Sequence, residues 1–183
     1  MTNMNRIALD NTRFIFMTNF SGDPARDKWG DDRRKANIII PSEDQAKDMT
    51  KAGINVRVTK PREHDDPATF KPEYFVQIQT KYRKRNREEV KYPPNVYLVT
   101  GDNDPVLLTE ETIGCLDKIR IKNVNCIVNP RENDDGNGIS LYVRTMYVEQ
   151  DMDDDPYAAL YRRKQAKSDI MDEDDPILCS REC

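Results

Sequence analysis

The sequence predicts a mainly β protein, a small antiparallel barrel or sandwich with one or two short helices. Short apolar runs bounded by Gly, Pro and Asp recur along the chain, and several segments alternate strictly between apolar and polar residues. A polar stretch rich in Gly, Asn and Asp separates the last two apolar runs, as expected for a hairpin. With 183 residues, 37% of them hydrophobic, the chain can form one domain with a modest core.

The first elements predicted along the chain are two strands and a helix. Residues 13–17 and 35–40 are apolar runs of strand length. Ser42 follows the second run, and Gln45 stands three residues later, which is typical of a capping box at a helix start. We expect this helix to end near Gly53.

The middle of the chain predicts four more strands and a helix start. Residues 55–59 and 74–82 alternate between apolar and polar side chains, so each strand should bury one face and leave the other in water. Residues 95–99 and 105–108 flank a Gly- and Asp-containing turn and are expected to pair. The threonines and glutamates of residues 109–116 favour a short helix.

The last two predicted strands, residues 119–128 and 139–148, are joined by the polar loop of residues 129–138. Seven or so short strands with one intervening helix suit either a sandwich or an open barrel. The spacing of the strands along the chain does not distinguish a sandwich from a barrel, and an OB-fold-like antiparallel barrel is the leading candidate.

The net negative charge of the chain is concentrated at one end. The net charge is −4, yet residues 168–183 contain six acids and one base, which leaves 27 acids and 28 bases in the rest. A body close to neutrality can still bind a polyanion when its cations are grouped. We therefore expect one folded domain over residues 1–160 and an acidic, disordered tail over residues 161–183.

The final hairpin offers a candidate surface for a polyanion. Tyr142 and Arg144 alternate with apolar neighbours on one strand, and Arg120 and Lys122 do so on the other. If these polar faces are contiguous, they form a platform for unpaired bases, because every base has a stacking face and every nucleotide a phosphate. The alternative is an ordinary solvated sheet face.

The only tryptophan lies in a charged segment. Trp29 is followed by Arg33, Arg34 and Lys35, and an exposed Trp beside these cations could stack on bases. The alternative is that Trp29 closes one end of the core.

A third basic grouping follows the strand at residues 74–82. Its cations are Lys81, Arg83, Lys84 and Arg85, within a segment that extends to residue 92. A basic loop can close over a single strand and make binding depend on salt, although such charge runs are often only solvated loops.

Four segments of the chain resemble blocks of a bacteriophage single-stranded DNA-binding protein family. They are residues 19–24, 34–41, 93–102 and 141–151. The resemblance covers roughly residues 13 to 156, and it implies an oligonucleotide-binding barrel that coats single strands during phage DNA replication and recombination without catalysis. The positions in these blocks that we expect to contact DNA are Lys35, Tyr97, Tyr142 and Arg144.

The end of the chain resembles the tails of bacterial single-stranded DNA-binding proteins, in which acids precede a Pro and a final aromatic residue. The matching residues are Asp172, Glu173, Asp174, Asp175, Pro176, Ile177 and Leu178. The apolar tip is aliphatic and five residues follow it, which departs from that pattern. Competition with DNA needs only the charge, so the resemblance implies a tail that competes for the DNA site or recruits replication proteins such as a polymerase or a helicase–primase.

No enzyme motif accompanies these features. His64 is the only histidine and lies in a Pro- and Asp-rich segment. The acids of residues 151–155 have the opening spacing of a calcium loop, but Pro156 stands where a Gly is needed. Cys115 and Cys126 lack a second pair for zinc. We expect no catalysis, no metal and no cofactor.

The expected partner is single-stranded DNA, with replication proteins bound through the tail and a weak homo-oligomer possible. We expect no membrane contact and a cytoplasmic location in an infected bacterial cell. An alternative function is that of a protein whose acids mimic DNA and inhibit a host nucleic-acid enzyme.

Overall fold

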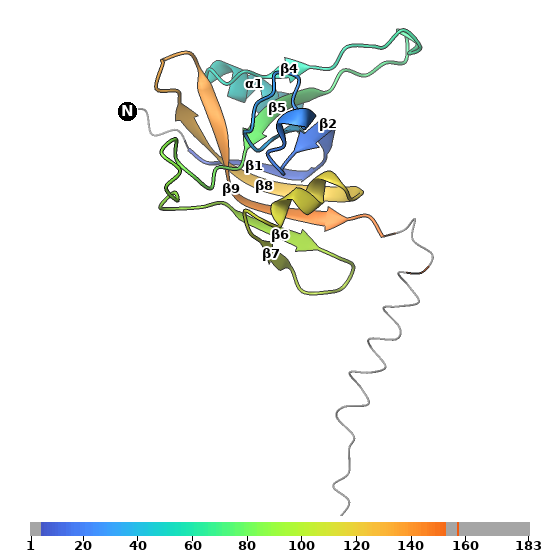
Figure 1. Ribbon diagram of the computed structural model, residues 1–183. Coiled ribbons are helices and arrows are strands. Elements are labelled where there is room, and N and C mark those ends of the chain that lie inside the picture. Colours follow the sequence, from blue (N-terminus) through green and yellow to red (C-terminus); the bar gives the residue numbers. More distant parts are fainter. Residues whose placement is uncertain (1–4, 153–156, 158–183) are drawn as a thin grey trace, which may run out of the picture. The chain divides into compact units, whose positions relative to one another are not determined.

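The computed structural model describes residues 5–152 and 157 (Figure 1). Within them, the strands form one nine-stranded sheet, accompanied by one α-helix and two short 3-10 helices. The mainly β prediction is confirmed. The strands are β1 (Ile7–Thr12), β2 (Phe14–Asn19), β3 (Lys35–Ile39), β4 (Arg57–Val58), β5 (Tyr74–Gln79), β6 (Asn95–Val99), β7 (Val106–Leu108), β8 (Ile121–Glu132) and β9 (Ile139–Gln150).

The strand order along the sheet is β1-β8-β9-β5-β3-β2, with β4 added on β5 and the β6–β7 pair added on β9. Most neighbours are antiparallel, but β9 pairs in parallel with both β5 and β6. The sheet is therefore mixed, where the sequence predicted an antiparallel one. Parallel neighbours cannot be joined by a tight turn, and the chain between these strands is long, since residues 80–138 separate β5 from β9 and residues 100–138 separate β6 from β9.

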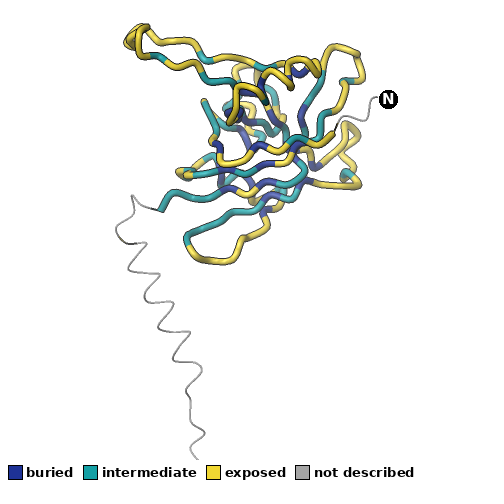
Figure 2. Tube along the Cα trace, turned by 180° about the vertical axis from the view of Figure 1, so that it is seen from behind, coloured by how far each residue is buried: buried dark blue, intermediate teal, exposed yellow. Residues whose placement is uncertain are grey.

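The core lies along the inward faces of these strands. In β5, Val76 and Ile78 are buried and Gln77 is exposed, as the alternation predicted. Phe75 is also buried, although it belongs to the opposite face, because the ring of Phe16 packs edge-on against it with centroids 5.3 Å apart. Figure 2 shows the buried positions concentrated within the strands and the exposed ones in the connecting segments.

The predicted helix is confirmed as α1 (Glu43–Lys51). The Ser42 side chain accepts a hydrogen bond from the backbone N–H of Gln45, which is the cap that the sequence predicted. The helix ends just before Gly53, whose φ of +87° suits a residue without a side chain. The other predicted helix is a 3-10 helix, η2 (Ile113–Asp117), and a further one, η1 (Pro24–Arg26), follows β2.

Two strands differ from the sequence prediction. β1 was not predicted, because only Leu9 and Thr12 of its six residues are buried and no periodic pattern results. The predicted strand at residues 55–59 is reduced to β4, only two residues long. The β8–β9 hairpin is longer than predicted, because its pairing continues to Glu132↔Ile139 and leaves a short tip.

The predicted boundary at residue 160 and the acidic tail lie outside the described residues. None of the helices in the described part has the length and apolar character needed to cross a bilayer.

Candidate nucleic-acid interface

A large groove, here called the basic groove, has a volume of about 1360 Å³. Its walls come from the β2–β3 connection, the end of β5 with the loop after it, Glu110, and the tip of the β8–β9 hairpin. The lining residues are Ser21, Gly22, Asp32, Arg33, Arg34, Gln79, Thr80, Lys81, Tyr82, Arg83, Lys84, Arg85, Arg87, Glu110, Arg131, Glu132, Asn133, Asp134, Asp135, Ser140 and Tyr142. Segments far apart in the sequence thus share one concave surface.

The groove carries more positive than negative charge. Eight of its lining residues are Lys or Arg and five are Asp or Glu, a net charge of +3. Three of the cations are ion-paired: Arg33 with Asp31, Arg83 with Glu110 and Lys84 with Glu88. Within the described part of the chain, no carboxylate lies within ion-pairing distance of the other five, which are Arg34, Lys81, Arg85, Arg87 and Arg131. None of these five is neutralised by a carboxylate in that part of the chain, so each can attract phosphates.

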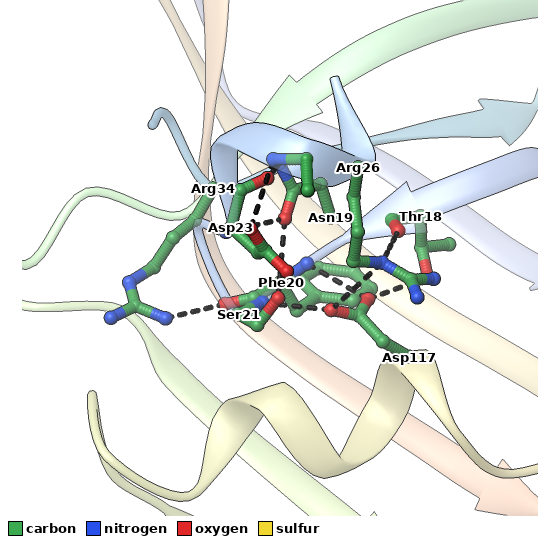
Figure 3. A network of polar contacts seen from close by, with 9 residues as sticks. Thr18, Asn19, Phe20, Ser21, Asp23, Arg26, Arg34 and Asp117 are labelled. Atoms are coloured by element: carbon green, nitrogen blue, oxygen red, sulfur yellow. Dashed lines mark hydrogen bonds and ion pairs between the residues drawn. The ribbon is translucent and has the colours of Figure 1, made fainter. Parts of the chain in front are cut away.

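One wall of the groove is held in place by Asp117, at the end of η2 (Figure 3). Its side chain is 2% exposed. Oδ1 accepts hydrogen bonds from the Thr18 hydroxyl (2.7 Å) and the Phe20 N–H (2.9 Å), and Oδ2 accepts one from the Ser21 N–H (2.8 Å). The guanidinium of Arg26 lies 3.7 Å from the same carboxylate. The carboxylate therefore fixes the backbone turn that follows β2.

The same turn is closed internally by Asn19, which is 3% exposed. Its amide donates to the Asp23 carbonyl and its side-chain oxygen accepts from the Asp23 N–H, both at 3.0 Å. Gly22 then takes a φ of +70°, and a Cβ there would lie 2.9 Å from the Asp32 carbonyl oxygen. The residues that resemble a phage family block, 19–24, therefore form a rigid groove wall.

Arg34 links this wall to the floor of the groove. Its guanidinium donates to the Phe20 carbonyl at 2.6 Å and lies 6.0 Å from the centre of the Tyr82 ring. Tyr82 is buried, and burial raises the pKa of its hydroxyl to about 12, so the ring stays neutral at physiological pH. Lys81, between two buried neighbours, points outward, with its ammonium 5.6 Å from the centre of the Tyr142 ring.

The loop after β5 is tied back to the body by Arg83. The Nε of Arg83 lies 3.1 and 2.9 Å from the two Glu110 carboxylate oxygens, and its guanidinium also donates to the Arg87 carbonyl. Arg83, one of the predicted DNA contacts, is thus paired with Glu110 and also shapes the loop. Arg85 and Arg87 remain exposed on the same loop.

The hairpin tip adds a cation that the sequence analysis missed. Arg131 is exposed on β8 and lines the groove beside Tyr142. Residues 129–138 were expected to be a polar loop, so Arg131 had no strand face to be assigned to. The signal for it would have been an extension of the hairpin alternation past residue 128.

Of the predicted contact residues, seven line the basic groove: Arg33, Arg34, Lys81, Arg83, Lys84, Arg85 and Tyr142.

Lys35, another predicted contact, does not line the basic groove. Its ammonium lies 2.6 Å from Asp27 and 3.5 Å from Asp31, and only 14% of its side chain is exposed. The hydrogen bond from Lys35, together with the Trp29 N–H, lowers the pKa of Asp27 to about 2. Lys35 is therefore already neutralised in this structure.

Arg120 and Lys122 do not share a surface with Tyr142, as the platform hypothesis required. Tyr142 pairs with Asn129, whereas Ile121 pairs with Gln150, eight residues further along β9. At about 3.3 Å per residue the two ends of the hairpin are roughly 26 Å apart. The Lys122 ammonium lies 3.8 Å from Glu149 at that far end.

The remaining predicted residues do not line the basic groove. Trp29 is 82% exposed, with the Lys28 ammonium 5.2 Å from its ring centre, so the alternative of a core position is excluded. Tyr97 stacks on Tyr147, and Arg144 lies against Tyr92. Among the described residues, no cluster of three or more His, Cys, Asp or Glu side chains is arranged to hold a metal ion.

A family model described as "Putative phage ssDNA-binding domain" matches residues 1–181. Solved structures similar to the chain include the C-terminally truncated single-stranded DNA-binding protein of bacteriophage Enc34, at 12% identity, a TM-score of 0.43, and coverage of 80% of this chain and 86% of that one. Another is the single-stranded DNA-binding protein gp2.5 of bacteriophage T7, at 12% identity, a TM-score of 0.38, and coverage of 84% and 98%. No curated protein sequence matches the chain.

Proposed function

Because the chain belongs to the phage single-stranded DNA-binding domain family, we propose that it binds single-stranded DNA in the basic groove without reading its sequence. The observation that carries this proposal is the convergence of five unpaired cations and the Tyr142 ring on one concave surface. Cations along a groove follow the phosphate backbone, and an aromatic ring stacks on any base, so such a site favours unpaired strands of any sequence.

The proposed role is to coat single strands exposed during phage DNA replication and recombination, in the cytoplasm of the infected bacterial cell and without catalysis. The net charge of +3 in the groove supports binding of a polyanion rather than imitation of one. An inhibitor that mimics DNA would instead present carboxylates on its concave surface.

Binding to oligonucleotides at two salt concentrations tests this function. Each phosphate contact contributes a slope of about −0.7 for single strands, so five cations predict a slope of about −3.5 in log K against log salt. Affinity should then fall roughly a hundredfold between about 50 mM and about 200 mM salt. Fluorescence anisotropy with an unstructured oligonucleotide and its duplex measures both the slope and the preference for single strands. Absence of binding at low salt would refute the function and favour the DNA-mimic alternative.

We also propose that the acidic tail competes with DNA for the basic groove and recruits replication proteins. The support is the sequence alone, since residues 168–183 contain six acids and one base. Deleting residues 168–183 should raise affinity for single-stranded DNA at least severalfold at low salt, because a tethered polyanion is then removed. Equilibrium titration of the full and truncated chains measures the change.

The matched control for the truncation keeps the length of the chain. Changing Asp172, Glu173, Asp174 and Asp175 to their amides removes charge alone and should reproduce most of the gain in affinity. Unchanged or weaker binding in both variants would contradict a competing tail.

A further inference from the structure

The outward face of β9 carries aromatic and basic side chains beyond the basic groove. Tyr142, Arg144 and Tyr147 all lie on this face, because β9 has a bulge at Arg144: Val128 pairs with Val143, while the preceding Ile127 already pairs with Thr145. The side chains that point into the core are Leu141 and Val143 before the bulge and Met146 and Val148 after it. The bulge thus keeps Tyr147 on the same side of the strand as Tyr142.

Two cations and an exposed ring lie next to the groove on this face. The Arg144 guanidinium is 5.8 Å from the centre of the Tyr92 ring, and the Lys91 ammonium is 5.2 Å from the same centre. Tyr92 is 68% exposed. Since Arg144 is two residues from Tyr142 on the same strand face, about 7 Å along the strand, this cluster lies next to the end of the groove.

A second aromatic site follows on β6 and β9. Tyr97 and Tyr147 are paired in the parallel register, and their rings stack with centroids 4.8 Å apart at an angle of 15°. Tyr147 is 41% exposed, and Leu107, the partner of Tyr97 on β7, is 51% exposed. Contiguous exposed apolar and aromatic side chains on one sheet face are typical of an interaction surface.

We propose that a single strand leaving the basic groove continues along β9, with its phosphates on Arg144 and Lys91 and its bases stacked on Tyr92 and Tyr147. These residues, with Tyr97, form the β9 platform. Continuity with the groove and the alternation of cations with rings favour nucleic acid over a second copy of this chain, which would need no cations. The proposal rests on the proposed function and adds a second binding segment to it.

Oligonucleotide length separates the two segments. Tyr147 lies five residues from Tyr142, roughly 16 Å along the strand, so a strand must extend past the groove to reach it. Affinity of the full chain is measured by fluorescence anisotropy for dye-labelled oligo(dT) from about 4 to about 16 nucleotides, the range that one small barrel domain covers. The variant is Tyr147→Ala, with Arg144→Ala as a second one that leaves the Tyr97 ring stack intact.

The expected result is that Tyr147→Ala and Arg144→Ala bind the shortest oligonucleotides as the unchanged protein does and lose about tenfold in affinity for the longest. Tyr147→Phe keeps a stacking ring and should retain the affinity for long strands. Val106→Ala, which truncates a residue 60% exposed on β7, is the matched control and should change nothing. Thermal melting of each variant reports on folding.

If both variants bound oligonucleotides of every length as tightly as the unchanged protein does, the platform would be overturned and the groove would not. If Tyr147→Ala changed the mass of the protein's assembly in solution and its DNA affinity did not depend on oligonucleotide length, the platform would also be overturned. The side chains of Tyr97, Leu107 and Tyr147 would then form an interface between copies of the chain. Failure of the unchanged protein to bind any oligonucleotide would instead refute the proposed function itself.

Discussion

The variant with Lys81, Arg85 and Arg131 all changed to glutamate should bind single-stranded DNA roughly a hundredfold more weakly, or worse, at low salt. All three side chains are exposed, line the basic groove and have no carboxylate partner among the described residues. Each cation that contacts a phosphate releases counterions from the strand, and a carboxylate in its place adds repulsion. Anisotropy titration with one oligonucleotide at several salt concentrations measures the loss.

The slope of the salt dependence should also become shallower, by about 2 for three lost contacts. The matched control reverses three exposed bases elsewhere, Lys60, Arg62 and Lys71, in the segment between β4 and β5. This control has the same net charge as the groove variant. If both variants lost affinity equally, overall charge would explain binding, and the assignment of the groove would be wrong.

Asp117→Ala should lower the free energy of unfolding by about 3 kcal/mol. The substitution leaves the N–H groups of Phe20 and Ser21 without their acceptor in a partly buried turn, and it removes the charge that faces Arg26. An unsatisfied buried donor costs about 1–3 kcal/mol. Urea unfolding followed by circular dichroism measures the change as a shift of the midpoint at constant slope.

The Asp117→Asn variant should lose less, because one amide oxygen remains as an acceptor. Glu111→Ala, an exposed carboxylate near the same 3-10 helix, should stay within about 0.5 kcal/mol of the unchanged protein. Since the turn that Asp117 holds forms one wall of the groove, DNA affinity should fall in Asp117→Ala as well. Unchanged stability in that variant would show that the turn folds without the carboxylate.

Features encoded within short stretches of sequence were predictable. The alternation in residues 74–82 identified the buried face of β5, and Ser42 with Gln45 marked the start of α1. The turn residues between β8 and β9 indicated the hairpin, although not its length. Each of these signals is local, because side-chain direction in a strand and the hydrogen bond of a helix cap both depend on residues close together in the sequence.

The site was only partly predictable for the opposite reason. Lys35 looks from the sequence like a free cation beside Arg33 and Arg34, yet folding brings Asp27 to within 2.6 Å of its ammonium. Arg83 finds Glu110, 27 residues away, in the same manner. Ion pairs across a loop or between strands depend on which segments meet, and alternation carries no information about that.

The sequence alone was enough to show that this protein is built mainly of β-strands, that Val76 and Ile78 of β5 face inward, and that its net negative charge lies in residues 168–183. Local sequence could not reveal that β9 pairs with β8 along one edge and with β5 and then β6 along the other, that Lys81, Arg131 and Tyr142 line one groove, or that Arg120 and Lys122 lie at the far end of the hairpin. The physical reason is that side-chain direction follows from local backbone geometry, whereas strand order and register are set by hydrogen bonds and packing between distant segments.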